Sequence, residues 1–144
     1  MPNPGEIWRD DAYYPDPDTG ELLPKFLLVL GVRAADGDVV YKLLTSRAHG
    51  RPETPVCYHG MPYPGYFLGL VTNPLLPLNT WVDLRESEEY DRREFDRFQQ
   101  AGRLAYVHTL QGATFIDAAR CVAGAPDTLK RQRVVIQDMI ASQP

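Results

Sequence analysis

The stretch PKFLLVLGVRAADGDVVYKLLTS, Pro24 to Ser46, decides the fold of this chain. Its apolar half is too short to cross a bilayer, which takes about 20 apolar residues, and its composition is typical of a strand buried on both faces. The pair Asp36-Gly37 predicts a tight hairpin turn, because both positions favour positive φ angles. The return strand alternates between two faces, with Val39, Tyr41, Leu43 and Thr45 on one and Val40, Lys42, Leu44 and Ser46 on the other. We therefore predict an antiparallel hairpin at the centre of the fold.

Shorter signals on either side of the hairpin predict the other elements. Strands are expected at residues 6–9, 66–71, 81–84 and 104–107, and helices at residues 110–122 and 128–141, the second capped by Asp127. Residues 85–102 predict an exposed helix or an ordered loop, and residues 10–23 and 47–65 predict surface loops. We predict a single domain over residues 1–144, mostly β with C-terminal helices (α+β). It should be a small, strongly curved antiparallel barrel or sheet with helices on one side and with Trp8 and Trp81 in its core.

Composition limits the functional classes. A net charge of −4 argues against indiscriminate coating of nucleic acid, which needs a broad basic surface, but it allows a small basic site. Cys57 and Cys121 are the only cysteines, and we expect reduced structural thiols. Cys57, His59 and His49 suggest a metal site, but a clear fourth ligand and the spacings of zinc modules are missing, so we predict no metal and no cofactor. The absence of a leader or spanning segment predicts a cytoplasmic protein without a membrane partner.

A locally positive stretch surrounds the hairpin. Five cations, Lys25, Arg33, Lys42, Arg47 and Arg51, stand there against two carboxylates. Hairpin pairing should bring Lys25 beside Thr45, Ser46 and Arg47, with His49 just beyond. A cation, hydroxyls and an imidazole at one end of a rigid hairpin suit phosphoryl-transfer chemistry on RNA, in which charge must be stabilised and protons exchanged. Charged and hydroxyl residues at strand ends also serve solubility and edge protection, and that explanation stays open. Tyr14 can stack on an unpaired base or simply anchor its own loop.

Several motifs, taken in order, resemble the MazF/PemK (Kid) toxins of bacterial type II toxin–antitoxin systems. They are PGEIW at residues 4–8, PKFLLVL at 24–30, LLTS at 43–46 and WVDL at 81–84. Members of that family typically open with P-G-[DE]-[IV]-[WY], continue with a strand introduced by a basic residue and a strand ending in T-[ST], and finish with helices. The family's threonine falls on Thr45, with Ser46 beside it. The family's arginine falls on or next to Lys25, where the order here is Pro-Lys-Phe and where lysine lacks the planar fork that grips a phosphate.

The resemblance implies a small SH3-like antiparallel barrel that is usually a homodimer. It implies metal-independent cleavage of single-stranded RNA, neutralised by a partner antitoxin protein. The residues expected to be catalytic are Lys25, Thr45, Ser46 and His49, and those expected to bind RNA are Arg47, Arg51 and Tyr14. A homodimer would also cover the apolar turn segment NPLLPLN, residues 73–79.

Two alternatives remain. A CcdB-like toxin has the same barrel but inhibits DNA gyrase by binding it, through residues of the C-terminal helix. A non-enzymatic SH3-like module would bind a protein partner with exposed aromatic side chains.

Overall fold

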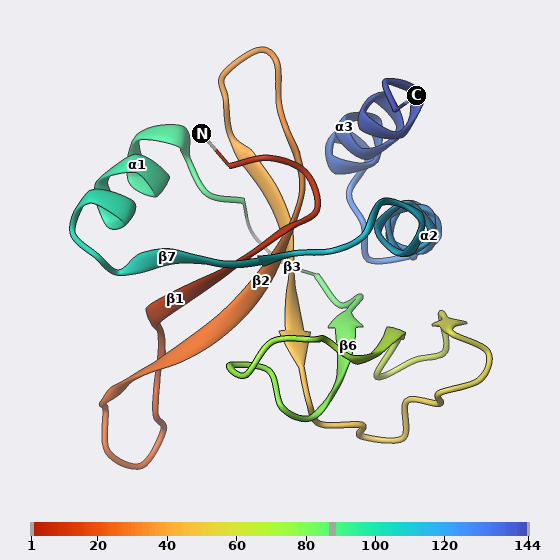
Figure 1. Ribbon diagram of the computed structural model, residues 1–144, viewed down its shortest axis with the longest axis horizontal. Helices are drawn as coiled ribbons and strands as arrows, with labels where there is room; N and C mark the ends of the chain where they lie inside the picture. Colours follow the sequence, from red (N-terminus) through yellow and green to blue (C-terminus); the bar gives the residue numbers. More distant parts are fainter. Residues whose placement is uncertain (1, 87–88, 144) are drawn as a thin grey trace.

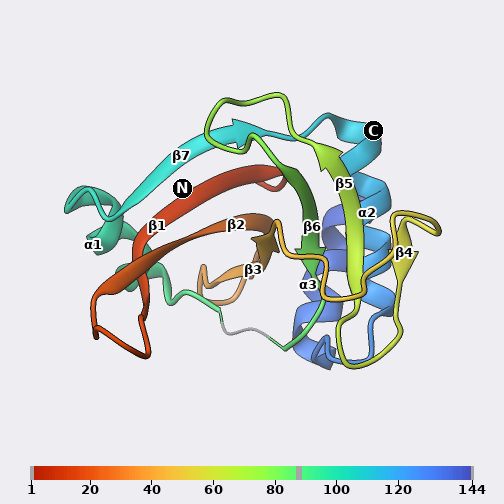
Figure 2. The same ribbon diagram turned by 90° about the horizontal axis from the view of Figure 1, so that it is seen from below.

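The computed structural model describes residues 2–86 and 89–143 and has an α+β fold that is mostly antiparallel β. Seven strands form one sheet in the order β4-β5-β6-β3-β2-β1-β7 (Figures 1 and 2). The strands are β1 (Glu6–Pro15), β2 (Leu22–Val32), β3 (Val39–Thr45), β4 (Cys57–Tyr58), β5 (Gly65–Leu70), β6 (Asn79–Asp83) and β7 (Leu104–Thr109). The helices are α1 (Arg92–Gln100), α2 (Gly112–Gly124) and α3 (Lys130–Ala141).

The predicted central hairpin is confirmed as β2 and β3, which pair with Leu27 opposite Leu43. Both faces are buried, because alternate residues of the two strands belong to two separate hydrophobic clusters. The turn between the strands differs from the prediction. Residues 34–37 form a longer loop, closed by a hydrogen bond from the amide of Arg33 to the carbonyl oxygen of Asp38 at 2.9 Å. In the Asp36-Gly37 pair only Gly37 takes a positive φ, of 78°, so the tight two-residue turn was wrong.

The two clusters lie on opposite faces of the hairpin. The larger cluster lies between the sheet and the helices α2 and α3, and Figure 1 shows these two helices together on one side. The smaller cluster lies near α1 and contains Trp8, whose ring meets Phe95 edge-on at 5.0 Å between centroids. Trp81 is also buried, at 5% exposure, and packs against Phe67. The predicted burial of both tryptophans is confirmed.

Three boundaries differ from the predictions. Strand pairing continues through most of the predicted loop 10–23, because β1 passes through a register shift after Asp10 and pairs Tyr14 with Leu23. The last helix begins at Lys130 with Leu129 as its N-cap, not Asp127. Residues 92–100 form the helix α1, whose N-cap Asp91 accepts hydrogen bonds from two backbone amides of the first turn.

The strand pairings leave β4 and β7 at the two edges of the sheet, so the sheet is not closed into the predicted barrel. Within residues 2–86 and 89–143, no helix has the length and apolar character needed to span a bilayer.

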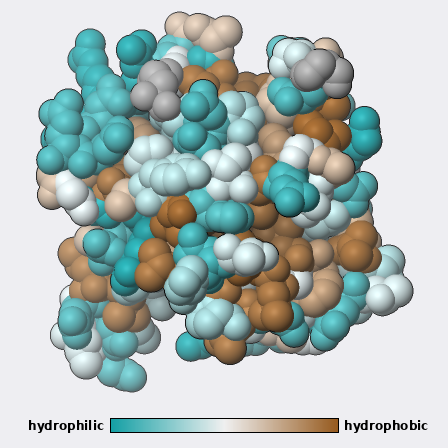
Figure 3. Space-filling model, in the orientation of Figure 1, coloured by the Kyte–Doolittle hydropathy of each residue, from teal (hydrophilic) through white to brown (hydrophobic). Residues whose placement is uncertain are grey.

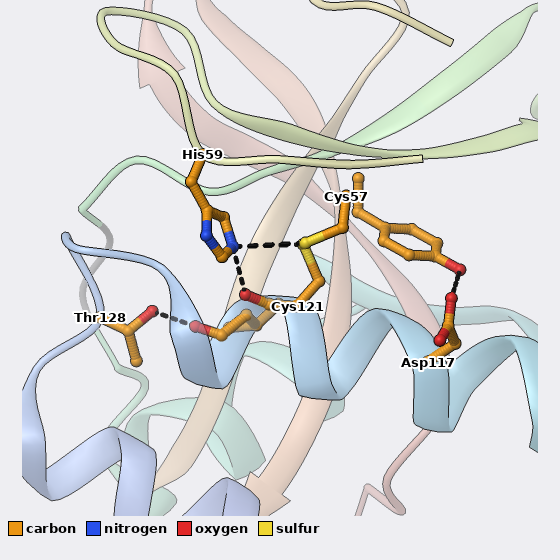
Figure 4. Close-up of a disulfide and its surroundings, with 7 residues drawn as sticks. Cys57, His59, Asp117, Cys121 and Thr128 are labelled. Atoms are coloured by element: carbon orange, nitrogen blue, oxygen red, sulfur yellow. Dashed lines mark hydrogen bonds between the residues drawn. A yellow bond between two sulfur atoms is a disulfide. The ribbon is translucent and has the colours of Figure 1, made fainter. Parts of the chain in front are cut away.

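The prediction that the two cysteines are reduced thiols was wrong. Cys57 and Cys121 form a disulfide between β4 and α2, with their Cα atoms 5.7 Å apart, so they are not reduced thiols (Figure 4). No local sequence pattern indicates this pairing, because 64 positions separate the two residues.

Candidate functional site

A cavity of about 360 Å³ opens where β2 begins and β3 ends. Six of the seven residues predicted for the site line it: Tyr14, Lys25, Thr45, Ser46, Arg47 and His49. They meet because β2 and β3 run antiparallel, with Leu27 opposite Leu43 as the last pair before the open end of the hairpin. The segment before β6 supplies an apolar wall through Leu75, Leu76, Pro77 and Leu78. The site therefore combines a polar, cationic side with a hydrophobic side.

Lys25 is the half-buried cation of the cavity. Its ammonium lies 5.3 Å from the centroid of the Tyr14 ring, a cation–π arrangement that holds both side chains. Burial lowers the pKa of Lys25, and the positive charges of Arg47 and Arg85 act in the same direction, while Asp83 opposes them. The lowered pKa makes this ammonium a stronger acid than that of an ordinary lysine.

The hydroxyl group of Thr45 stabilises the turn that follows β3. Its Oγ1 accepts a hydrogen bond from the backbone amide of Arg47 at 3.1 Å, and as an acceptor it keeps its own proton for donation. Ser46 and Arg47 follow as exposed residues at the rim of the cavity. Arg47 is therefore accessible to an anion that reaches Lys25.

His49 is held by stacking. Its ring lies over Tyr63 with centroids 4.8 Å apart and planes 18° apart. Its φ of 47° lies in the left-handed region, which costs a residue with a side chain about 1–2 kcal/mol. The guanidinium groups of Arg51 and Arg85 also lie near the Tyr63 ring, at 5.3 and 5.1 Å from its centroid. Tyr63 thus fixes the loop that positions the imidazole.

Arg51 differs from the other predicted residues because its side chain is only 1% exposed and does not line the cavity. Its Nε and Nη1 donate to the carbonyl oxygens of Pro64 and Arg47, each at 3.0 Å. Its Nη2 lies 3.2 Å from Oδ1 of Asp83. Arg51 supports the loop behind the cavity.

Asp83 and Arg85 line the cavity and were missed by the sequence analysis. Arg85 donates to both carboxylate oxygens of Asp83, with Nη2 at 2.7 Å from Oδ2. Burial opposes ionisation of Asp83, but the hydrogen bonds and charge of Arg85 and the charge of Arg51 outweigh it and lower the pKa of the carboxyl. The available signal was a carboxylate inside the otherwise apolar strand WVDL.

Two cations of the positive stretch do not line the cavity and instead stabilise the fold. Lys42 is 1% exposed and donates through Nζ to the carbonyl oxygen of Arg85 at 2.8 Å. Arg33 lies at the other end of the hairpin and forms ion pairs with Asp36 and Glu89. The sequence-level cluster therefore separates into residues that line the cavity and residues that hold it.

One group of side chains could hold a metal ion among the described residues. Cys57, His59 and Cys121 bring their ligand atoms within 4.8 Å of one another. His49, which the sequence analysis associated with this group, stacks on Tyr63 instead.

The cavity can bind an anion with an apolar attachment. Lys25, Arg47 and Arg85 outnumber the single carboxylate of Asp83, and the leucine wall offers a surface to an aromatic or aliphatic group. Comparison with known proteins gave no match to a protein-family model, to a curated protein or to a solved structure. The functional interpretation therefore rests on the residues themselves.

Proposed function

We propose that the protein is a cytoplasmic endoribonuclease toxin of the MazF/PemK type, with an open variant of the SH3-like barrel of that family as its fold. It cleaves single-stranded RNA without a metal ion, acts as a homodimer and is neutralised by an antitoxin protein. One observation carries the proposal: Lys25, Thr45, Arg47 and His49 line the same cavity beside an apolar wall. A nucleotide has the matching chemistry, because its phosphate is anionic and its base is flat and largely apolar on its faces.

Cleavage requires the ribose 2′-hydroxyl to attack the adjacent phosphorus and the 5′-oxygen of the next nucleotide to leave. His49 takes the proton of the 2′-hydroxyl as its oxygen bonds to phosphorus. Lys25 stabilises the charge on the phosphorane, and its lowered pKa suits it to protonate the leaving oxygen. Thr45 positions a phosphate oxygen through its hydroxyl proton. The products are a 2′,3′-cyclic phosphate and a 5′-hydroxyl.

Binding should depend on the few cations of the cavity, because the chain has a net charge of −4. If Lys25, Arg47 and Arg85 each neutralise one phosphate, the logarithm of the binding constant should fall with the logarithm of salt concentration with a slope of about −2. Arg47→Ala should make this slope shallower by about 0.7.

The test is incubation of the purified protein with single-stranded RNA, with and without EDTA. Lys25→Ala and Thr45→Val should each lower the cleavage rate by about 10²–10³-fold while the protein remains folded. Lys130→Ala and Thr72→Val are matched controls, because both residues are exposed and lie outside the cavity lining. RNA that stays intact with the wild type overturns the proposal and leaves the CcdB-like toxin and the binding module. Full activity of both cavity variants would place the chemistry elsewhere.

The proposed homodimer has its own measurement. The leucines at positions 70, 75 and 78 are 67%, 53% and 61% exposed, and Figure 3 shows hydrophobic residues interrupting the polar surface in the lower half of the view. Burying such side chains between two copies is favourable. Light scattering should give twice the chain mass of 16.3 kDa, and a particle of 16.3 kDa at micromolar concentration would contradict the dimer.

A further inference from the structure

His59 lies against the disulfide in a way that the cross-link itself does not require. Its Nε2 is 3.3 Å from Sγ of Cys57 and 3.5 Å from Sγ of Cys121 (Figure 4). The same nitrogen lies 2.9 Å from the carbonyl oxygen of Cys121 in α2. The imidazole thus faces both sulfurs at once and comes from the same short segment as Cys57.

Helix α2 leaves room for the imidazole of His59. A Cβ at Gly124 would lie 3.2 Å from Cε1 of His59, so a side chain at that position would crowd the imidazole. Cys121 is only 5% exposed, which shields its sulfur from bulk water. Two sulfurs, from β4 and α2, and one imidazole, from the residue that follows β4, therefore form a pre-arranged set of three donors.

We propose that Cys57, His59 and Cys121 bind a thiophilic divalent metal ion of the zinc class once the disulfide is reduced. A thiol reductant supplies two electrons and two protons, the S–S bond breaks into two thiols, and the reductant becomes a disulfide. The metal ion then displaces both thiol protons, which pass to water. His59 gives up the hydrogen bond from Nε2 to the carbonyl oxygen of Cys121, releases the Nε2 proton to water and takes one on Nδ1, so that the neutral imidazole binds through Nε2. A water molecule completes a tetrahedral set.

The geometry fits such an ion. Bonds of about 2.3 Å to sulfur and about 2.0–2.1 Å to nitrogen at a tetrahedral centre place sulfur and nitrogen about 3.6 Å apart. The two observed separations, 3.3 and 3.5 Å, lie close to that value. The two sulfurs have to separate to about 3.8 Å, which side-chain rotation provides.

The metal would replace the disulfide as the link between β4 and α2 in a reducing compartment, where thiols are kept reduced. This link matters for the cavity, because residues 47–65 carry His49 and Tyr63 and include Cys57. The inference itself does not depend on RNA cleavage, since it rests only on the three donors.

Anaerobic titration with Co²⁺ tests the proposal, because cobalt reports thiolate ligands and tetrahedral geometry in its absorption spectrum. The protein is purified with its disulfide, reduced, freed of reductant and titrated. Reduced wild type should bind one equivalent with a thiolate-to-cobalt charge-transfer band, Zn²⁺ should displace the cobalt, and the oxidised protein should show no such band.

Variants separate the three-donor site from adventitious thiol binding. His59→Ala should weaken Co²⁺ binding by more than about tenfold, since even partners outside the ligand set typically contribute that much. The double variant Cys57→Ser, Cys121→Ser should lose the charge-transfer band. His108→Gln, a histidine outside the group, should bind as the wild type does.

Two controls separate a loss of metal binding from a failure to fold. His59→Ala keeps both cysteines, so it can fold with the disulfide intact before reduction. Zn²⁺ should also raise the melting temperature of reduced wild type and not that of the double variant. A reduced wild type without a charge-transfer band, or His59→Ala with unchanged cobalt affinity, would overturn the proposal.

Discussion

Asp83→Asn should destabilise the protein by about 3 kcal/mol at neutral pH. The side chain of Asp83 is 9% exposed and faces that of Arg51, which is 1% exposed. Removing the charge leaves a buried guanidinium with two neutral carbonyl oxygens as its remaining acceptors, those of Pro64 and Arg47. Breaking a buried ion pair from one side typically costs about 3–5 kcal/mol.

The lower end of that range applies here. Arg85, the other partner of Asp83, is 48% exposed in its side chain, so its ion pair contributes only about 0–1 kcal/mol. The asparagine oxygen can also keep the hydrogen bond that Oδ1 of Asp83 accepts from the backbone amide of Arg85 at 3.1 Å. For a chain of this size, a loss of about 3 kcal/mol lowers the melting temperature by about 6–12 °C.

The pH dependence has a definite sign. Because the pKa of Asp83 is lowered in the folded state, its contribution is fully present above the unfolded pKa of about 3.9 and is lost as the pH falls through the folded pKa. The difference in stability between wild type and Asp83→Asn should therefore be constant at neutral pH and should shrink below about pH 4.

Urea unfolding at a series of pH values measures both effects, with the fluorescence of the buried Trp8 and Trp81 as the signal. Asp11→Asn is the matched control, because its ion pair with Arg9 is solvent-exposed and should change stability by less than about 1 kcal/mol. A loss below 1 kcal/mol for Asp83→Asn would refute the buried ion pair. A difference that persists unchanged at pH 3 would refute the carboxylate charge as its cause.

Two further substitutions test the packing around the hairpin. Gly31→Ala places a Cβ 2.8 Å from Cγ1 of Val135, so the Val135 side chain or α3 itself must shift. Urea unfolding should show that the free energy of unfolding falls by about 1–3 kcal/mol, and wild-type stability would contradict the close approach. Tyr90→Phe removes the hydroxyl that donates at 2.7 Å to the fully buried carboxylate of Asp10. The free energy of unfolding should fall by about 1–3 kcal/mol. Acid unfolding should begin at a higher pH, because the hydrogen bond from Tyr90 helps to lower the pKa of Asp10. An unchanged midpoint of acid unfolding would contradict this role of the hydrogen bond.

The central hairpin was predictable because local signals agreed with one another. An apolar strand, a turn with Gly37 and an alternating return strand specify the pairing, and the pairing then brings Lys25 to Thr45. Local signals led to a wrong prediction for residues 10–23, which were expected to form a loop. There the strand continues because Asp10, a poor strand residue, finds the guanidinium of Arg103 at 2.7 Å across the sheet. A partner 93 positions away leaves no local pattern in the sequence.

The candidate site was predictable from the hairpin and the segments next to it in sequence, but not from β6. Asp83 and Arg85 reach the cavity because β6 pairs with β3, with Val82 opposite Leu44. That contact joins segments whose proximity depends on the whole sheet order. The pairing of Cys57 with Cys121 depends on the same tertiary arrangement.

The distribution of charge explains how an acidic protein can carry a cationic cavity. Asp83 is the only carboxylate of the lining among the described residues, and the buried Arg51 beneath it balances its charge. The lining cations Lys25, Arg47 and Arg85 therefore act on the cavity without full compensation. In the proposed function, Arg51 would therefore not contact the RNA. It would favour RNA binding by neutralising the carboxylate of Asp83, which would otherwise repel a phosphate. Its loss should impair the site by unfolding residues 47–65, whereas loss of Arg47 at the rim should weaken anion binding in a folded protein.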